Sequence, residues 1–404
     1  MKASAKYLER FAEPEARLPE LRGLRAHGPW THALTLPVRR ESLDCLRAVA
    51  APAARARVLL VLVVNAAEDP EDRRQNAALI AALEDRARPR WRAARLSLHR
   101  LAEPAQLDVL LVDRSSPPGN FSARDGVGLA RKLGADLIAQ LIAEELIESP
   151  WIHTTDADAE LPADHFERLA ALPLGAAVAP FRHVEADDPA VHEATLRYEL
   201  SLRYYVLGLR SAGSPYAFHT IGSLISVAAP LYAQARGFPR RQAGEDFYML
   251  NKLAKLGPLH QLGGAPVRIR SRRSSRAPFG TGPAVEALLG GKAHEVYDPR
   301  VFEALGQALA SLADPSAQAP AELPELADWY AGARELARRY GEGQLAGRLR
   351  EHFDGFRTLK LIHALSVRWP KLPWPQALAR ARFLELSAEL PLVAQRDRLA
   401  SLEA

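Results

Sequence analysis

At 404 residues the chain is too long for one ordinary domain, so we expect one large domain with an appendage, or two domains. Hydrophobic residues make up 48% and charged residues 25%, as in globular proteins, and no apolar run reaches the ~18 residues that span a bilayer. The net charge of +5 is compatible with phosphorylated ligands, anionic lipid headgroups or nucleic acid, and it selects none of them.

The N-terminal residues 1–10 have no apolar core, so we expect no signal peptide. The single cysteine, Cys45, excludes an internal disulfide and a multi-cysteine zinc site, and its leucine neighbours indicate a buried structural thiol. We therefore expect a cytoplasmic protein. The basic, apolar segment 360–374 would allow at most peripheral contact with the inner membrane face, because its prolines prevent a long interfacial helix.

After about 28 polar, helix-like residues, strands and helices alternate in the first half of the chain. The Val- and Leu-rich run 57–64 is typical of a strand buried on both faces. This alternation implies right-handed crossovers and a mostly parallel sheet between helices. Strands are predicted at 32–38, 57–64, 107–112 and 151–155, and helices at 41–49, from 70 to 83, and at 127–147.

The second half has a different pattern. We expect a strand over 175–181, a long amphipathic helix over 190–209, an apolar segment over 221–228, and a helix from 245 that stops at Gly257. From about Glu295 onward the chain is predicted to be all-helical. No recognised nucleic-acid-binding module appears, so nucleic acid is not an expected partner.

Polar residues follow the predicted strands of the first half. In open α/β sheets, ligands bind at the carboxyl ends of the strands, so these residues are expected to share one edge. They are Arg39, Glu41, Asn65, Asp69, Asp113, Asp156 and Asp158.

The pair Asp156 and Asp158 directly follows an apolar strand. Such a strand delivers two carboxylates to one edge of a sheet. Mg²⁺ is commonly held by one or two carboxylates together with waters and substrate phosphates. The pair therefore predicts a place where a metal meets a diphosphate.

A second acidic pair, Glu245 and Asp246, opens a predicted helix. A carboxylate there is also explained by simple helix capping. The Gly237–Pro239 turn and Gly244 precede the pair, and it occurs together with the first pair. A group-transfer reaction needs such a division, because one acidic pair holds metal and leaving group while another carboxylate deprotonates the incoming hydroxyl.

Five segments in this order resemble the motifs of the family-2 glycosyltransferases, over about residues 30–285. The segment 34–41 is similar to the first-strand motif Pro-Val-x-x-Glu, and the strand ending at Asn65 to the second motif, whose paired aspartates are replaced here. The segment 126–134 resembles Gly-x-x-x-Ala-Arg-Asn-x-Gly, with Lys132 in place of Asn. Asp156-Ala157-Asp158 and Gly244-Glu245-Asp246 fall where the metal-binding and acceptor-activating motifs belong.

The resemblance implies an α/β fold of the GT-A, nucleotide-diphospho-sugar transferase type with a C-terminal helical appendage. The implied organisation is an N-terminal helical extension over 1–28, a GT-A domain over 29–290, and an α-helical region over 291–404. Within the GT-A domain, 29–158 would be the nucleotide-binding half and 159–290 the acceptor half.

The resemblance also implies an inverting glycosyltransferase that uses Mg²⁺ or Mn²⁺ and a nucleotide-sugar. The acceptor would be a saccharide, a lipid-linked sugar or a small molecule, and the lack of a Gln-x-x-Arg-Trp motif favours a non-processive enzyme. Asp246 would be the general base, and Glu245 would orient it or the acceptor. The residues expected around the nucleotide are Pro37, Glu41, Asn65, Asp113, Arg131 and Asp156. The expected metal ligands are Asp156, Asp158 and, by position, His260.

Arg268, Arg270 and Arg272 alternate along the segment 268–276, which is followed by the glycine-containing segment 279–282. Guanidinium groups suit phosphate because they form bidentate hydrogen bonds. We hypothesise a loop that closes over the donor diphosphate, with Arg272 among the donor contacts, or that grips an anionic acceptor. A solvated basic loop is the alternative.

Two other functions stay open. A sugar-phosphate nucleotidyltransferase would share a related topology, but Arg39-Arg40-Glu41 lacks the glycines expected after its first strand. A catalytically degenerate domain could act as a scaffold in a carbohydrate-assembly complex. The presence of both acidic pairs favours an enzyme.

Overall fold

The computed structural model describes residues 2–103, 106–122, 124–185, 187–274, 280–310, 312, 314 and 316–403. The chain forms two compact units, and both are discontinuous in sequence. Unit 1 comprises Met1–Val184 and Thr220–Ser271, and unit 2 comprises Glu185–His219 and Arg272–Ala404. The domain boundaries drawn from the sequence stay predictions.

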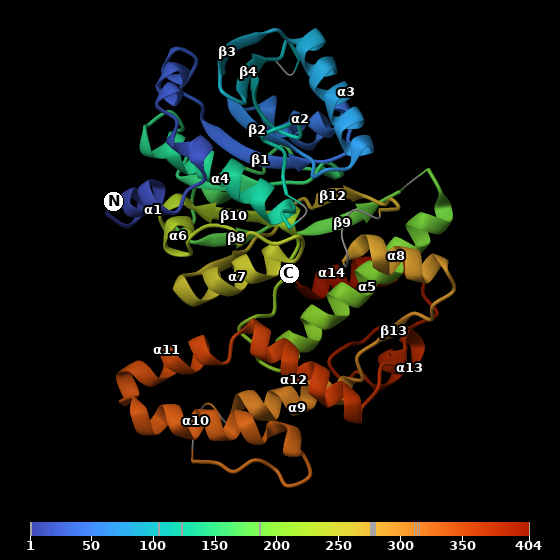
Figure 1. Ribbon diagram of the computed structural model, residues 1–404. Coiled ribbons are helices and arrows are strands. Elements are labelled where there is room, and N and C mark those ends of the chain that lie inside the picture. Colours follow the sequence, from blue (N-terminus) through green and yellow to red (C-terminus); the bar gives the residue numbers. More distant parts are fainter. Residues whose placement is uncertain are drawn as a thin grey trace. The chain divides into compact units, whose positions relative to one another are not determined.

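Unit 1 is built on a large mixed sheet, which has nine strands among the described residues, in the order β11-β8-β10-β6-β1-β2-β5-β4-β3. The central strands β6, β1, β2 and β5 are parallel, and β10 and β4 run antiparallel to the strands beside them (Figure 1). The predicted α/β architecture with a mainly parallel sheet flanked by helices is thus confirmed at this level. It is compatible with a Rossmann-like fold.

The strands of this sheet are β1 His32–Val38, β2 Val58–Asn65, β3 Pro89–Ala93, β4 Leu96–Arg100, β5 Leu107–Arg114, β6 Trp151–Thr154, β8 Ala176–Val178, β10 Ile225–Ala228 and β11 Leu259–Gln261. Every residue of β2 is buried, as its apolar run predicts. A smaller sheet, with the order β7-β12-β9, contains β7 Ala159–Glu160, β12 Val267–Arg270 and β9 Phe181–Val184.

Two local features of unit 1 differ from the sequence-based prediction. The hairpin β3–β4 was not expected, because Arg90 and Arg92 alternate with half-buried residues and give β3 little apolar character. The helix predicted over 41–49 is instead a 3₁₀ turn, Leu43–Leu46, followed by α2, Arg47–Ala53. The Ser42 side chain accepts a hydrogen bond from the Asp44 N–H and starts this turn, later than predicted.

The helices of unit 1 are α1 Lys2–Arg10, α2 Arg47–Ala53, α3 Pro70–Arg86, α4 Val127–Ala143, α6 Ala229–Gln234 and α7 Glu245–Leu256. Helix α4 lies against β1, β2 and β6. A Cβ at Gly134 would overlap the Thr35 hydroxyl on β1, so only glycine permits this close packing. The third glycine of the 126–134 segment therefore sets the distance from helix to sheet.

Lys132, which replaces the motif's Asn, ties the N-terminal segment to α4. Its ammonium group donates to Asp136 (2.5 Å) and to the Phe11 carbonyl (2.8 Å). Tyr7 and Tyr232 donate to the same Asp136 carboxylate, which is fully buried. Each of these polar groups has a partner, so the network stabilises the position of α1.

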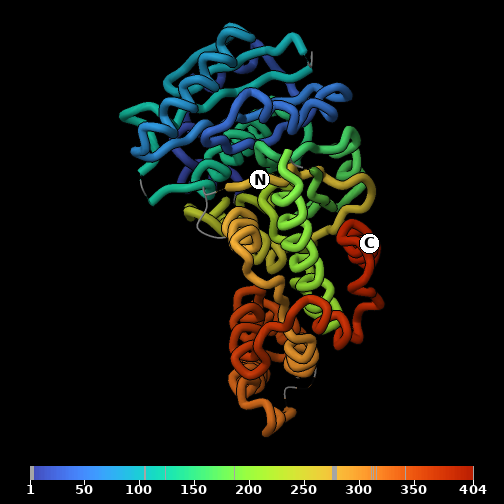
Figure 2. The backbone as a smooth tube through the Cα atoms, turned by 90° about the vertical axis from the view of Figure 1, so that its right-hand side faces the viewer, coloured from blue at the N-terminus to red at the C-terminus, as the bar shows by residue number. Residues whose placement is uncertain are grey.

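Unit 2 is mainly helical, but its C-terminal part, predicted to be all-helical from about Glu295, also contains two short strands. Its helices are α5 Pro189–Ser211, α8 Thr281–Leu289, α9 Pro299–Ala310, α10 Ala327–Arg339, α11 Glu342–His352, α12 Gly355–Arg368, α13 Trp374–Arg380 and α14 Leu392–Glu403, and the short strands β13 Glu295–Val296 and β14 Leu372–Pro373 pair with each other. Helices α9 to α12 gather in the orange and red part of Figure 2.

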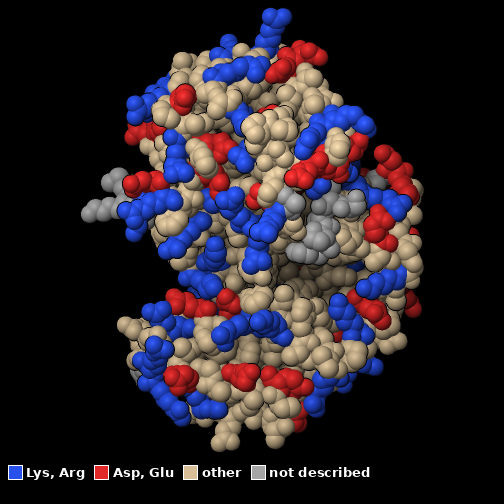
Figure 3. Space-filling model, viewed as in Figure 1, with Lys and Arg blue, Asp and Glu red and all other residues tan. Residues whose placement is uncertain are grey.

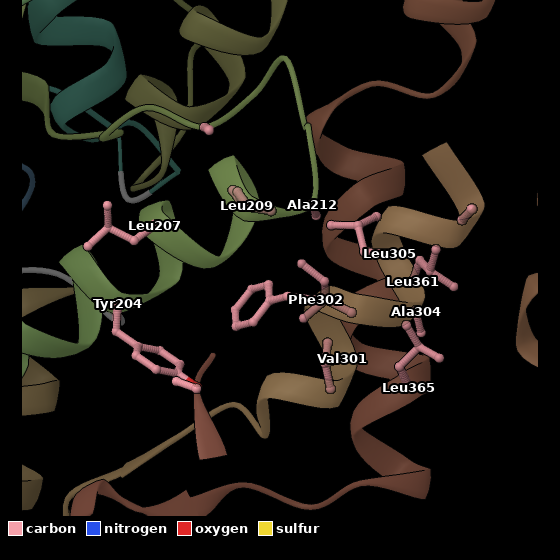
Figure 4. Packing of buried hydrophobic residues seen from close by; sticks show 14 of the residues in the cluster. Tyr204, Leu207, Leu209, Ala212, Val301, Phe302, Ala304, Leu305, Leu361 and Leu365 are labelled. Atoms are coloured by element: carbon pink, nitrogen blue, oxygen red, sulfur yellow. The ribbon is translucent and has the colours of Figure 1, made fainter. Parts of the chain in front are cut away.

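One hydrophobic cluster forms the core of unit 2 and draws on α5, α9, α12 and the segments after them. Figure 4 shows Phe302 of α9 in this cluster, and its ring lies edge-on to that of Tyr204 on α5, with centroids 5.8 Å apart. A Cβ at Gly208 would lie 2.5 Å from the Phe302 ring. Gly208 therefore leaves the space that the phenylalanine fills.

Three general properties of the chain follow. Cys45 is buried, as predicted, and burial raises its pKa to about 12. Among the described residues, no helix is both long and apolar enough to cross a bilayer. Basic and acidic side chains are interspersed on the face drawn in Figure 3.

Candidate active site

The site in unit 1 is organised around Arg131 in the second turn of α4. The helix begins at Val127, directly after Gly126. A Cβ at Gly126 would overlap Gln242, and one at Gly128 would overlap the backbone of Pro239. The two glycines thus let the loop that precedes α7 reach the start of α4, which brings segments more than one hundred residues apart into contact.

Arg131 joins the two acidic pairs that the sequence singles out. Its Nε donates to Glu245 Oε1 (2.7 Å), and its Nη2 donates to Asp156 Oδ1 (2.6 Å). The Arg131 and Glu245 side chains are each 4% exposed, whereas that of Asp156 is 29% exposed. Burial opposes the charge on the arginine, but the two carboxylates raise its pKa. Arg131 is therefore a permanent cation that fixes both acidic pairs.

Gly222 also contacts this arginine, a role that local sequence patterns hardly indicate. Its carbonyl accepts from Arg131 Nη1 (3.1 Å) and from the Thr154 hydroxyl of β6. A Cβ at Gly222 would overlap the guanidinium group. The only sequence signal is a glycine beside serine in the apolar segment 221–228, which is too common to mark a site.

Glu245 and Asp246 form the first turn of α7. Gly244, the residue before the helix, has φ +73°, a left-handed conformation that favours glycine. Glu245 contacts Arg131, so the pair does more than cap a helix. Burial, and then the adjacent Glu245 carboxylate, raise the pKa of Asp246 to about 7, whereas Arg131 acts in the opposite direction. Asp246 is thus a carboxyl group that titrates near pH 7.

Asp156 and Asp158 lie in the connection between β6 of the large sheet and β7 of the small one. One Asp156 oxygen contacts Arg131, and the side chain remains partly exposed. The Asp158 carbonyl accepts from the N–H of Arg270 at the end of β12 (2.7 Å). Within the described part of the chain, no group of three His, Cys, Asp or Glu residues has the geometry of a complete metal site.

The end of β1 is fixed by ion pairs that the sequence did not reveal. Pro37 is buried in β1 and faces Val63 of β2. Arg39 and Arg40 both bind Asp72, which is fully buried at the start of α3. Arg40 has φ +57°, a strained value for a residue with a side chain. Glu41, the expected nucleotide contact, is partly exposed directly after this strained residue.

Asn65 is the last residue of β2 and Asp113 the second-last residue of the neighbouring strand β5. The Asn65 amide donates to the carbonyl of Val38 (3.0 Å), so it links β2 to the end of β1. Asp113 Oδ1 accepts from the backbone N–H groups of Ser115 and Ser116, and although burial opposes this, these hydrogen bonds lower the pKa of Asp113. Both side chains shape the edge of the sheet, and their contact with a nucleotide stays a prediction.

The structure does not bring His260 to the aspartate pair. His260 lies on β11, at the edge of the large sheet, and β8 and β10 separate it from β6. At about 4.8 Å per strand, this is a separation of roughly 14 Å. Its Nε2 instead contacts the Pro173 carbonyl (3.2 Å).

The arginine segment is only partly described. Arg268 and Arg270 lie on β12, whereas Arg272 follows the strand and begins the second segment of unit 2. The predicted loop residues 275–279, which include Arg276 and Phe279, lie outside the described residues. The donor contact of Arg272 stays a prediction.

Comparisons with known proteins add no assignment: the chain matches no protein-family model, and a search of curated proteins found no significant match.

Proposed function

We propose that the chain is an inverting, metal-dependent, non-processive glycosyltransferase with a GT-A type fold, similar to family 2. The observation that carries the proposal is the ion-pair cluster of Arg131, Asp156 and Glu245. The cluster brings together, within unit 1, two acidic motifs that lie far apart in the sequence. The cluster leaves Asp246, with its raised pKa, next to the acidic pair suited to a metal.

In this proposal Asp246 is the general base. Its carboxylate accepts the proton of the acceptor hydroxyl, and the oxygen forms a bond to the anomeric carbon of the donor sugar. The bond from that carbon to the diphosphate oxygen breaks on the opposite face, and its electron pair leaves with the nucleoside diphosphate. A pKa near 7 suits this role, because around neutral pH about half of the groups are ionised and each ionised carboxylate is sufficiently basic.

Arg131 and Glu245 are positioning residues in this scheme. Arg131 holds Asp156 through one nitrogen and Glu245 through another, so the distance between the two motifs is fixed before substrate arrives. The negative charge of Glu245 also keeps the pKa of its neighbour Asp246 high. Preorganised charges of this kind lower the barrier because they need no rearrangement during the reaction.

The donor set fits a hard divalent cation. Asp156 and Asp158 supply carboxylate oxygens, and Asp156 remains partly exposed although one oxygen contacts Arg131. Mg²⁺ or Mn²⁺ held jointly by one or two carboxylates and substrate phosphates would neutralise the leaving diphosphate. His260 is not needed for such a site.

Thermal-shift titration with UDP-, GDP-, ADP-, CMP- and TDP-sugars, with and without Mn²⁺, tests the proposal, because a ligand that binds the folded state raises its stability. We expect one nucleotide class to give a metal-dependent shift. The variant Asp158→Ala should lose this shift. The control Asp44→Ala, which removes an exposed carboxylate elsewhere in unit 1, should keep it.

Each result that differs from these expectations points to a different conclusion. Equal donor affinity in Asp158→Ala and the wild type would refute the assignment of the aspartate pair. No shift with any nucleotide would favour the scaffold function. Formation of a nucleotide-sugar from a sugar phosphate and a nucleoside triphosphate would favour the nucleotidyltransferase.

A further inference from the structure

The exposed face of the small sheet β7-β12-β9 carries three arginines. Along β12, Val267 and Ile269 are buried while Arg268 and Arg270 are exposed, and Arg182 is exposed on β9. Alternation of this kind places all the buried side chains on one face and the arginines on the other. Figure 1 shows β9 and β12 side by side.

Two of these arginines lie directly opposite each other. β12 and β9 are parallel, and Arg268 is in register with Arg182. Like charges at directly opposite positions destabilise a sheet. On the other side of β12, Arg268 faces Glu160 of β7, but its Nε is 3.8 Å from the carboxylate and both side chains are about half exposed. The pair is thus weak, and the Arg268 guanidinium stays largely exposed.

The arginine face adjoins the aspartate pair. The Arg270 N–H donates to the Asp158 carbonyl (2.7 Å), which continues the ladder in which Arg268 faces Glu160. This hydrogen bond places the backbone of Arg270 next to that of Asp158. Within the described part of the chain, the Arg270 guanidinium makes no ion pair.

The position of this face distinguishes it from the expected donor site. Asp156 and Asp158 connect the large sheet to the small one, and Asn65 and Asp113 end strands of the large sheet. A nucleotide at the carboxyl ends of those strands would lie on one side of the aspartate pair. The three arginines lie instead on β9 and β12 of the small sheet, so they are not at the ends of those strands.

We propose that the Arg182, Arg268 and Arg270 face binds the phosphate group of a phosphorylated acceptor. The proposal rests on the proposed function, since it assigns the acceptor class of the same site. Guanidinium groups bind phosphate oxygens in pairs, and the small sheet holds all three on a regular backbone. The bound anion also offsets the repulsion between Arg182 and Arg268.

The test is ³¹P NMR titration with inorganic phosphate at constant ionic strength, for the wild type and for the double variant Arg268→Gln/Arg270→Gln. We expect phosphate affinity to fall about tenfold or more, because two charge-assisted contacts are lost. The matched control is Arg90→Gln/Arg92→Gln, which removes two exposed, alternating arginines from β3 of the same unit. It should bind phosphate like the wild type.

The second arm separates acceptor phosphate from donor diphosphate. Metal-dependent nucleoside-diphosphate binding, measured on the same proteins, should be unchanged in the β12 double variant. Unchanged phosphate affinity in that variant would overturn the proposal, as would an equal loss in the β3 control. Loss of nucleoside-diphosphate affinity with phosphate affinity retained would also overturn it, because the arginines would then serve the donor. If no nucleotide binds at all, the proposed glycosyltransferase function fails. The phosphate titration still shows whether the arginine face binds phosphate.

Discussion

Each unit of the molecule buries one arginine that holds two carboxylates, and the two clusters differ in their charge balance. In unit 1, Arg131 contacts Asp156 and Glu245, and a third carboxylate, Asp246, lies beside them with its pKa raised to about 7. One guanidinium therefore faces three acidic groups. This surplus of buried negative charge destabilises the folded protein unless a bound cation neutralises it or the carboxylate takes part in a reaction.

In unit 2, Arg203 of α5 is 2% exposed and binds Glu199, one turn earlier, and Glu403 at the end of α14. Glu403 also contacts His219 (2.9 Å), and Arg210 donates to the carbonyl of Glu403 (2.8 Å). Here cationic and polar donors surround each carboxylate, and the contacts join the C-terminal helix to α5.

A buried arginine that contacts two carboxylates therefore does not by itself indicate a functional site. In unit 2 the cluster is satisfied within itself and connects two helices, so it is structural. In unit 1 it keeps an acidic excess next to a partly exposed aspartate, as a site for a cation and a general base requires.

The largest effect is expected on catalysis. Asp246→Asn keeps the size of the side chain but removes the base, so we expect turnover to fall by about 10²–10⁴-fold. Metal-dependent donor binding should persist, because Asp246 is not among the expected metal ligands. Turnover measured at saturating donor, together with donor affinity, checks this. Normal turnover in the variant would remove Asp246 from the mechanism.

The second prediction compares the two arginines directly. Arg131→Met and Arg203→Met each leave two carboxylates without their main partner, and we expect each to destabilise its unit by roughly 3–5 kcal/mol. Mn²⁺ should restore stability in part to Arg131→Met only, since a cation can replace the lost charge there. Chemical unfolding with and without Mn²⁺ measures both. Equal rescue of the two variants would mean that the clusters do not differ in this respect.

The third prediction uses two glycines. Gly208→Ala would place a methyl group 2.5 Å from the Phe302 ring in the core of unit 2, so we expect it to destabilise that unit by about 1–3 kcal/mol without affecting donor binding. Gly222→Ala would instead displace the Arg131 guanidinium, so donor binding should weaken more than stability. Unfolding curves and donor titrations of both variants would show this, and identical profiles would contradict it.

The smallest expected effect is the pH dependence of stability in the absence of metal. The folded-state pKa of Asp246 is raised from 3.8 to about 7, so the folded protein binds more protons than the unfolded chain between these values. Its contribution to stability is therefore present below about pH 4 and is lost as the pH rises through about 7. At about pH 8 we expect Asp246→Asn to unfold about 2 °C or more above the wild type, with no such gain at about pH 4. A constant difference at both pH values would refute the raised pKa.

Much of unit 1 could be predicted from local patterns. The apolar run of β2 predicts a strand buried on both faces, and Asp69 precedes a helix whose first residue is proline. The hairpin β3–β4 was missed because its exposed arginines hide the strand pattern. The parallel centre of the sheet was predicted, whereas the antiparallel strand β10, which contacts both β6 and β8, was not.

The candidate site residues can be recognised from the amino-acid pattern alone: the two acidic pairs, Arg131, and the alternating arginines of β12. Spacing along a strand or at a helix start is local, so it can be read without a fold. Which of these residues come into contact depends on the fold. It brought Arg131 between Asp156 and Glu245, left His260 on a distant edge strand, and set Arg268 opposite Arg182. These are contacts between residues remote in sequence, and they depend on close approaches at Gly126, Gly128 and Gly222 that no local pattern encodes.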